Sequence, residues 1–224
     1  FQIFFPILKR MKLIKDKLNE LNPDVIISFG DSTNVQTIIA NKFLRIKSAR
    51  HIISIRTNPT KINFLLKVAA ILFYRFSNLL VVQTSFVKNW ARKRFKRLNI
   101  KTIYNPIDIS PLNEKKDIIN FLNVGTIKFE KNHLLLLKSF NKIHHSLNNQ
   151  SKLIIVGGIE SNELYKKLLH FIEKNNLEDK VVFKGAKKNV NNYYCNNNIF
   201  VLSSIYEGMS NALLEAMSLE SACI

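Results

Sequence analysis

Residues 198–219 read NIFVLSSIYEGMSNALLEAMSL, and this stretch decides the fold that we expect. Its first six residues form an apolar, β-branched run, which is typical of a buried strand in a parallel sheet. Ser210 is a suitable N-cap, so we expect a helix to begin near Asn211. A strand that passes through a glycine-containing loop into a helix is the repeating unit of α/β folds.

The same alternation of strand and helix runs along the rest of the chain. Further apolar runs predict strands at residues 24–29, 51–56, 79–84, 101–104, 121–125, 152–158 and 180–185, with helical periods between them. Such alternation implies right-handed crossovers and doubly wound α/β sheets that are covered on both faces. Because residues 104–117 hold two prolines and many polar residues, we expect two Rossmann-like domains, residues 1–107 and 108–224, both incomplete.

Composition restricts the class of protein without identifying it. The chain has 34 Lys and Arg against 16 Asp and Glu, a formal charge of +18, which favours a phosphate-bearing ligand, an acidic membrane surface or nucleic acid as partner. An AT-rich coding sequence would give the same bias without selection for binding. Residues 64–76 form the longest apolar stretch, but two basic residues interrupt it and no transmembrane helix is expected. The chain lacks an initiator Met and ends on an apolar run, so we expect a fragment truncated at both ends.

Two glutamates in the first stretch are candidates for chemistry. Glu207 falls in the loop at the carboxyl end of a predicted strand, and Glu215 falls about one turn into the helix that follows. Backbone N–H groups at a helix N-terminus bind phosphate, and carboxylates accept hydrogen bonds from sugar hydroxyls. Open α/β sheets bind ligands at this edge. The alternative is that both glutamates only complement the helix dipole.

A second stretch, residues 121–140, carries a candidate cation. It reads FLNVGTIKFEKNHLLLLKSF, which predicts a strand, a glycine turn, a short basic loop and a helix. Gly125 would let the backbone approach a ligand closely. Lys131 comes just before the helix, where its ammonium could reach a diphosphate. The alternative for Lys131 is a solvated loop lysine, the usual environment of this residue type.

Together these segments resemble glycosyltransferase family 4, the group 1 glycosyltransferases of the GT-B fold. The similar segments are NPID at 105–108, VGTIKFEKN at 124–132 and EGMSNALLE at 207–215. The resemblance implies a retaining hexosyl- or N-acetylhexosaminyltransferase that uses a nucleotide sugar. UDP-sugars are the commonest donors of such enzymes. The acceptor would be a glycan or a polyprenyl-linked saccharide in cell-envelope or glycan biosynthesis, and the resemblance implies no metal and no cofactor.

The resemblance also gives individual residues a role. Lys131 would contact the donor diphosphate, Glu215 the ribose hydroxyls and Glu207 the hydroxyls of the transferred sugar. Lys131 and Glu207 are therefore the expected catalytic residues, and these groups should converge on one pocket. The expected donor-binding set is Gly125, Thr126, Lys131, Glu207, Gly208, Met209, Ser210, Asn211 and Glu215. Thr126 stands where the family often has Arg, which leaves the diphosphate more dependent on Lys131.

The N-terminal half is expected to bind the acceptor. Arg56 and Asn58 follow a predicted strand and would face the cleft, although Arg56 could equally be a surface arginine. Residues 86–98 interleave aromatic and basic side chains, which predicts a basic amphipathic helix suited to anionic headgroups. The alternative is an ordinary Rossmann helix with a solvated charged face. We expect a cytoplasmic protein, peripheral at the inner face of the plasma membrane.

Two other interpretations stay open on the sequence alone. One is a basic α/β module that binds nucleic acid, with steeply salt-dependent affinity and no role for the paired glutamates. The other is a catalytically inactive remnant. The main hypothesis needs no nucleic acid and no metal. Accordingly, we expect His51, His133, His144 and His145 at the surface or in loops, because their spacing does not suit a metal site.

Overall fold

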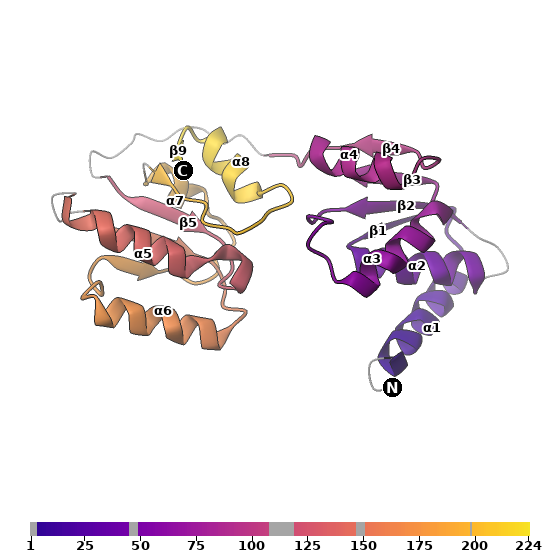
Figure 1. Cartoon of the computed structure of the whole chain (residues 1–224), viewed down its shortest axis with the longest axis horizontal. Coiled ribbons are helices and arrows are strands. Elements are labelled where there is room, and N and C mark those ends of the chain that lie inside the picture. The colour runs from indigo at the N-terminus through magenta and orange to yellow at the C-terminus, as the bar shows by residue number, and fades with distance from the viewer. Residues whose placement is uncertain (1–3, 45–48, 108–118, 147–150, 198) are drawn as a thin grey trace. The chain divides into compact units, whose positions relative to one another are not determined.

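The chain forms two compact units in the computed structural model, Phe1–Asn105 and Pro106–Ile224, which we call unit 1 and unit 2 (Figure 1). The structure describes residues 4–44, 49–107, 119–146, 151–197 and 199–224. The expected domain boundary, between residues 107 and 108, lies two residues from the division between the units. Most of the proline-containing segment 104–117 lies outside the described residues.

Unit 1 is built on a parallel sheet in which strand order follows chain order, β1-β2-β3-β4. The strands are β1 (Val25–Phe29), β2 (Arg50–Ile55), β3 (Leu79–Val82) and β4 (Ile100–Thr102). The helices are α1 (Phe4–Leu21), α2 (Asp31–Phe43), α3 (Phe64–Phe73) and α4 (Ser85–Arg94), with a short 3₁₀ helix η1 (Tyr74–Phe76). Right-handed crossovers between successive neighbours put α2, α3 and α4 on one face, where they share one core.

The first strand departs from the expectation that strands are covered on both faces. In β1, Ile26 and Ser28 are buried, whereas Val25, Ile27 and Phe29 are exposed. The reason is the one-sided arrangement of the crossover helices, which leaves the opposite face of this edge strand uncovered in the described part of unit 1.

Unit 2 contains a doubly wound parallel sheet with the order β7-β6-β5-β8-β9. The strands are β5 (Phe121–Val124), β6 (Leu153–Val156), β7 (Val181–Phe183), β8 (Ile199–Phe200) and β9 (Ala222–Cys223). The helices are α5 (His133–Ile143), α6 (Asn162–Lys174), α7 (Asn191–Cys195) and α8 (Asn211–Ser218), with 3₁₀ helices η2 (Phe129–Lys131) and η3 (His144–Ser146). One core lies under α5 and α6 and a second under α7 and α8. The direction of winding reverses between β5 and β8, the position at which open α/β sheets bind ligands.

Polar caps set the starts of several helices. The side chains of Thr84, Ser161 and Ser210 accept hydrogen bonds from backbone N–H groups of the first turns of α4, α6 and α8. Each such cap stabilises a helix by about 0.5–2 kcal/mol. The start of α8 at Asn211 agrees with the start expected from the sequence.

Helix α4 exposes less apolar surface than the basic amphipathic helix that was one of the two expectations from its sequence. Trp90 is only 7% exposed and Phe95 only 5%, because both pack into the core of unit 1, and only Phe86 of the three aromatic residues is exposed. The basic residues of the last turn lie outside, and the Arg94 guanidinium lies 4.4 Å from the centre of the Trp90 ring. The structure therefore matches the alternative of an ordinary Rossmann helix with a charged outer face. Within the described ranges, no helix is both long and apolar enough to cross a membrane.

Candidate functional site

Two loops meet where β5 and β8 end. These neighbouring strands pair in parallel, so the loop after β5 and the loop after β8 leave the same edge of the sheet. The Ser203 hydroxyl donates to the carbonyl of Lys131 at 2.8 Å, and the Ile205 N–H donates to the carbonyl of Glu130 at 2.8 Å. The Tyr206 hydroxyl donates to Glu130 Oε1 at 3.3 Å. These hydrogen bonds fix the position of one loop against the other.

The centre of this junction is an ion pair between the two expected catalytic residues. Lys131 Nζ lies 2.7 Å from Glu207 Oε1, and the Ser204 hydroxyl donates to the same oxygen at 2.7 Å. The side chains of Lys131 and Glu207 are 19% and 27% exposed, so the pair is largely shielded from water but open to the surface. An anion that entered here would meet a positioned ammonium group, and a hydroxyl would meet a positioned carboxylate.

Glycines allow the backbone to pass close beneath the lysine. A Cβ atom built at Gly125 would lie 3.3 Å from both Cδ and Cε of Lys131, so the lysine stem crosses directly over this residue. A Cβ at Gly157, at the end of β6, would lie 2.0 Å from the Gly125 carbonyl oxygen. Gly157 therefore has to be glycine for β5 and β6 to end where they do. Thr126, next to Gly125, is partly exposed.

Glu215 is held by a residue that the sequence did not single out. Its Oε2 atom accepts a hydrogen bond from the Tyr194 hydroxyl at 2.9 Å. Burial, followed by the Glu215 carboxylate, raises the pKa of Tyr194, so the phenol stays protonated and acts as the donor. Among the hydrogen bonds of the described residues, Glu215 shares none with Lys131 or Glu207. The segment that leads from Glu207 into α8 consists of Gly208, Met209, Ser210 and Asn211.

Of the three side chains expected to converge on one pocket, the structure brings Lys131 and Glu207 into contact. The structure joins Lys131 to Glu207 and places Gly125 beneath them, while Glu215 is held one turn into α8 by a contact of its own. The donor-binding roles of these residues stay predictions. Within the described ranges, no group of three or more His, Cys, Asp or Glu side chains comes together as a metal site.

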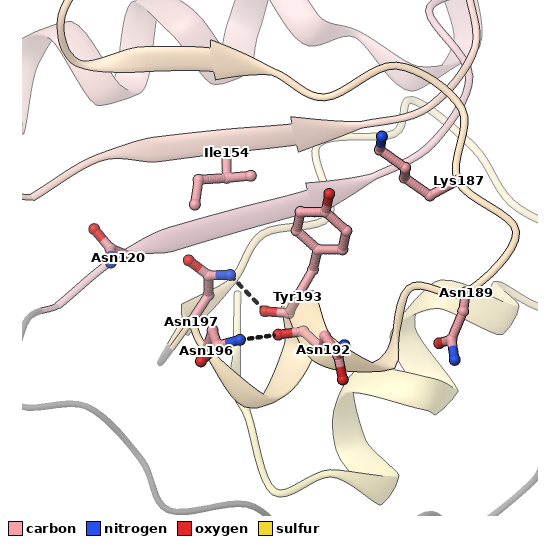
Figure 2. A pocket seen from close by; sticks show the side chains of 8 residues that line it. All are labelled: Asn120, Ile154, Lys187, Asn189, Asn192, Tyr193, Asn196 and Asn197. Atoms are coloured by element: carbon pink, nitrogen blue, oxygen red, sulfur yellow. Dashed lines mark hydrogen bonds between the residues drawn. The ribbon is translucent and has the colours of Figure 1, made fainter.

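A pocket of about 450 Å³ lies beside α7 in unit 2, apart from these residues (Figure 2). It is lined by Asn120, Ile154, Lys187, Asn189, Asn192, Tyr193, Asn196 and Asn197. Two of these amides, on Asn196 and Asn197, donate to backbone carbonyls of α7 itself, as the dashed lines in Figure 2 show. None of the residues expected to bind the donor lines this pocket.

Three of the histidines expected at the surface or in loops are buried. His51 and His133 are fully enclosed, and His144 packs against Phe140, whereas His145 is exposed as expected. Burial and, secondarily, Lys42 lower the pKa of His51 to about 4, and burial and Lys131 lower the pKa of His133 to about 4. A neutral imidazole is far less costly to bury than a charged one, so these positions are compatible with a core.

The expected acceptor residues lie in unit 1, just after β2. Arg56 is exposed, and its guanidinium lies 5.7 Å from the centre of the Phe29 ring. The Asn58 side chain accepts hydrogen bonds from the N–H group of Thr60 at 3.0 Å and from its hydroxyl at 2.8 Å. Asn58 thereby stabilises its own turn, and Arg56 is the more accessible of the two for a ligand.

A buried polar network, absent from the sequence-based expectations, supports the same edge of unit 1. The Tyr74 hydroxyl donates to Asp31 Oδ1 at 2.7 Å, and the Thr57 hydroxyl donates to Asp31 Oδ2 at 3.1 Å. Asp31 and Asn34 belong to the first turn of α2 and are buried. The network ties the loop that carries Arg56 to the core of unit 1.

Comparison with known proteins places these features in context. The family model for glycosyl transferases group 1 matches residues 105–224. An uncharacterised glycosyltransferase of Methanocaldococcus jannaschii is 31% identical over 240 residues, covering 96% of this chain and 58% of that protein. A Campylobacter jejuni protein is 27% identical over 95% of this chain and 58% of its own length. It is an α-1,4-N-acetyl-D-galactosaminyltransferase named for a diphospho-undecaprenol-linked saccharide. The chain thus spans a little over half the length of these relatives.

Solved structures show the same fold. A TarM variant of S. aureus in complex with alpha-GlcNAc-glycerol and UDP superposes with a TM-score of 0.81 at 20% identity, covering 95% of this chain and 44% of that one. HepE of Anabaena in complex with UDP and glucose gives a TM-score of 0.76 at 17% identity, covering 97% and 61%. The α/β architecture with parallel sheets is that of GT-B proteins, as expected from the sequence.

Proposed function

We propose, starting from the fact that this chain belongs to the glycosyl transferases group 1 family, that it acts in sugar transfer from a nucleoside-diphosphate sugar, with retention at the anomeric carbon. The observation that carries the proposal is the 2.7 Å contact between Lys131 and Glu207 at the point where the winding of the sheet reverses. The two residues lie 76 positions apart, and the fold brings together one cation and one carboxylate at the ligand-binding edge of the sheet.

The positions of the charges suit the departure of a nucleoside diphosphate. As the glycosidic bond to the donor phosphate breaks, negative charge grows on the phosphate oxygens, and a fixed ammonium stabilises that charge without reorganising. Lys131 would exchange Glu207 for the diphosphate when the donor binds. Glu207, still held by Ser204, would then accept hydrogen bonds from hydroxyls of the transferred sugar.

The proposed donor nucleotide is UDP. Two solved structures with this fold, TarM and HepE, were determined with UDP bound. The donor sugar is proposed only as a hexose or N-acetylhexosamine, since one relative is named as an N-acetylgalactosaminyltransferase and HepE was determined with glucose. Parallel titrations with UDP-glucose, UDP-N-acetylglucosamine and UDP-N-acetylgalactosamine would separate these possibilities.

The proposed acceptor is a lipid-linked saccharide at the cytoplasmic face of the plasma membrane. Two Campylobacter relatives are named for diphospho-undecaprenol substrates. In unit 1, helix α3 offers the apolar surface that α4 does not, because Leu65 is 76% exposed and Phe64 75%. The exposed apolar residues of α3 are Phe64, Leu65, Val68, Ile71 and Leu72. Lys61 and Arg75 flank this helix in the chain, which suits anionic headgroups.

The first test is UDP binding by the full-length protein, measured by isothermal titration calorimetry. Lys131→Ala removes a charge-assisted contact with phosphate, so binding should weaken about 10- to 100-fold. Lys167→Ala is the matched control, because it removes an ion pair of similar length, 2.6 Å, on the exposed face of α6. Equal affinities in the Lys131 variant and the wild type would refute the site.

Glu207→Gln separates sugar contact from phosphate contact. The amide no longer neutralises Lys131, so UDP should bind at least as tightly as it binds the wild type. The transfer rate should fall, because the contact proposed for the sugar is lost. If UDP binding and transfer fell by the same factor, Glu207 would be contributing to the nucleotide site and not to the sugar site.

A further inference from the structure

Helix α7 contributes two adjacent tyrosines with opposite environments. Tyr193 lines the pocket beside α7, as Figure 2 shows. Tyr194 is only 1% exposed and lies in the core under α7 and α8, with its ring centre 5.8 Å from that of Phe200. The one polar atom of this buried side chain donates to Glu215 Oε2 at 2.9 Å. A buried hydroxyl needs such a partner, and here the partner is the carboxylate expected to bind ribose.

We propose that Tyr194 is a positioning residue of the nucleoside site, which holds one carboxylate oxygen of Glu215 so that the other can accept hydrogen bonds from the ribose hydroxyls. The inference rests on the proposed function, because it assumes that a nucleoside diphosphate binds at α8. It adds a residue that no motif in the sequence marks, 21 positions before its partner.

The geometry explains why one hydroxyl would matter. Glu215 is the fifth residue of α8, one turn into the helix, and has three rotatable side-chain bonds, so an unrestrained carboxylate would lose conformational freedom when it binds ribose. The Tyr194 ring is fixed by burial, and its hydroxyl therefore fixes the carboxylate before the ligand arrives. A carboxylate has two acceptor oxygens, and Tyr194 donates to Oε2, so Oε1 is the oxygen that we assign to the ligand.

The hydrogen bond also has a single direction. An ionised carboxylate is an acceptor only, so the phenol has to donate. Burial in the core and, after it, the neighbouring Glu215 charge raise the pKa of Tyr194, which keeps the donor proton in place.

The experiment compares two nucleotides in the full-length protein. UDP and 2′,3′-dideoxy-UDP are titrated into the wild type, Tyr194→Phe and Tyr165→Phe. Tyr165, in α6, is the matched control, because its half-buried ring packs edge-on against Phe183 away from α8. Tyr194→Phe should weaken UDP binding by about three- to tenfold and leave dideoxy-UDP binding unchanged. Tyr165→Phe should change neither affinity.

A merely structural role of Tyr194 would give a different result. Loss of packing would weaken both nucleotides by the same factor, and that outcome would overturn the proposal, as would unchanged UDP binding in Tyr194→Phe. A second variant, Glu215→Asp, tests the same geometry with Tyr194 in place, because the shorter acid cannot reach both partners. If Glu215→Asp bound UDP as tightly as the wild type, a positioned carboxylate would not be needed and the proposal would fail.

Glu215→Ala distinguishes failure of this inference from failure of the proposed function. If the wild type prefers UDP over dideoxy-UDP and Glu215→Ala loses that preference, Glu215 binds ribose, and the Tyr194 result then decides the inference alone. If Glu215→Ala keeps the full preference, Glu215 does not bind ribose and the inference is refuted at its premise. The Lys131→Ala titration is independent of both results and tests the phosphate site by itself.

Discussion

Substituting Gly157 by alanine tests the link between the fold of unit 2 and its candidate site. The new Cβ would lie 2.0 Å from the Gly125 carbonyl oxygen, so the ends of β5 and β6 must move apart by about 1 Å to reach a tolerable contact. Two hydrogen bonds join these strand ends, from Gly125 N–H to Val156 O at 2.9 Å and from Ile127 N–H to Gly158 O at 2.8 Å. Overpacking of this kind typically destabilises by about 1–3 kcal/mol, and weakening of the two bonds brings the expected loss to about 3 kcal/mol.

The assay is urea unfolding and thermal unfolding, each followed by circular dichroism, together with UDP titration. A loss of about 3 kcal/mol corresponds to a fall in Tm of roughly 10 °C for a unit of this size. UDP should also bind more weakly, because Gly125 lies directly under the Lys131 stem. Gly158→Ala is the control, since its Cβ would meet only the Ala186 side chain at an ordinary 3.8 Å. Equal stabilities of the two alanine variants would refute the reasoning.

Three further predictions concern the histidines, α3 and acid stability. The ring protons of His51 and His133 should show no NMR titration above about pH 5, and an inflection near pH 6.5 would contradict their burial as neutral groups. Because both folded pKa values lie below the unfolded value of about 6.5, the free energy of unfolding should have its full value above pH 6.5. It should then fall by up to about 3 kcal/mol per histidine towards pH 4, measured as urea midpoints. Leu65→Glu should reduce sedimentation with phosphatidylglycerol vesicles, whereas Leu135→Glu, at another exposed leucine, should not, and equal binding of both would exclude α3 as the contact.

Strands β1 to β8 were predictable because their sequences satisfy two requirements at once, whereas the two-residue strand β9 (Ala222–Cys223) was not expected. A run such as residues 121–124 is apolar except for Asn123 and lies next to a glycine turn, and no helical period competes with it. Lys131, Glu207 and the start of α8 were predictable for a related reason. Each belongs to the segment that leaves the carboxyl end of β5 or β8, and parallel strands bring their carboxyl ends to one edge of the sheet.

The features that escaped prediction depend on contacts distant in the chain. Tyr194 lies in an asparagine-rich stretch without periodicity, and only the packing of α7 on α8 brings it to Glu215. The buried face of α4 could not be predicted either. Trp90 and the basic residues alternate around this helix, and its packing against the sheet decides which of them is buried. Burial of His51 and His133 likewise depends on protonation state, which the residue type alone does not reveal.

The hydrogen bonds from Ser203 and Ile205 to the loop after β5 have a consequence for the order of assembly. Lys131 is synthesised long before its acidic partner, and β8 can pair with β5 only after α6, β7 and α7 have been made. Pairing of segments so far apart forms late, because a long loop must close first. The junction that holds Lys131 and Glu207 should consequently be among the last parts of unit 2 to form, so under the proposed function nucleotide affinity should report whether β8 has paired with β5.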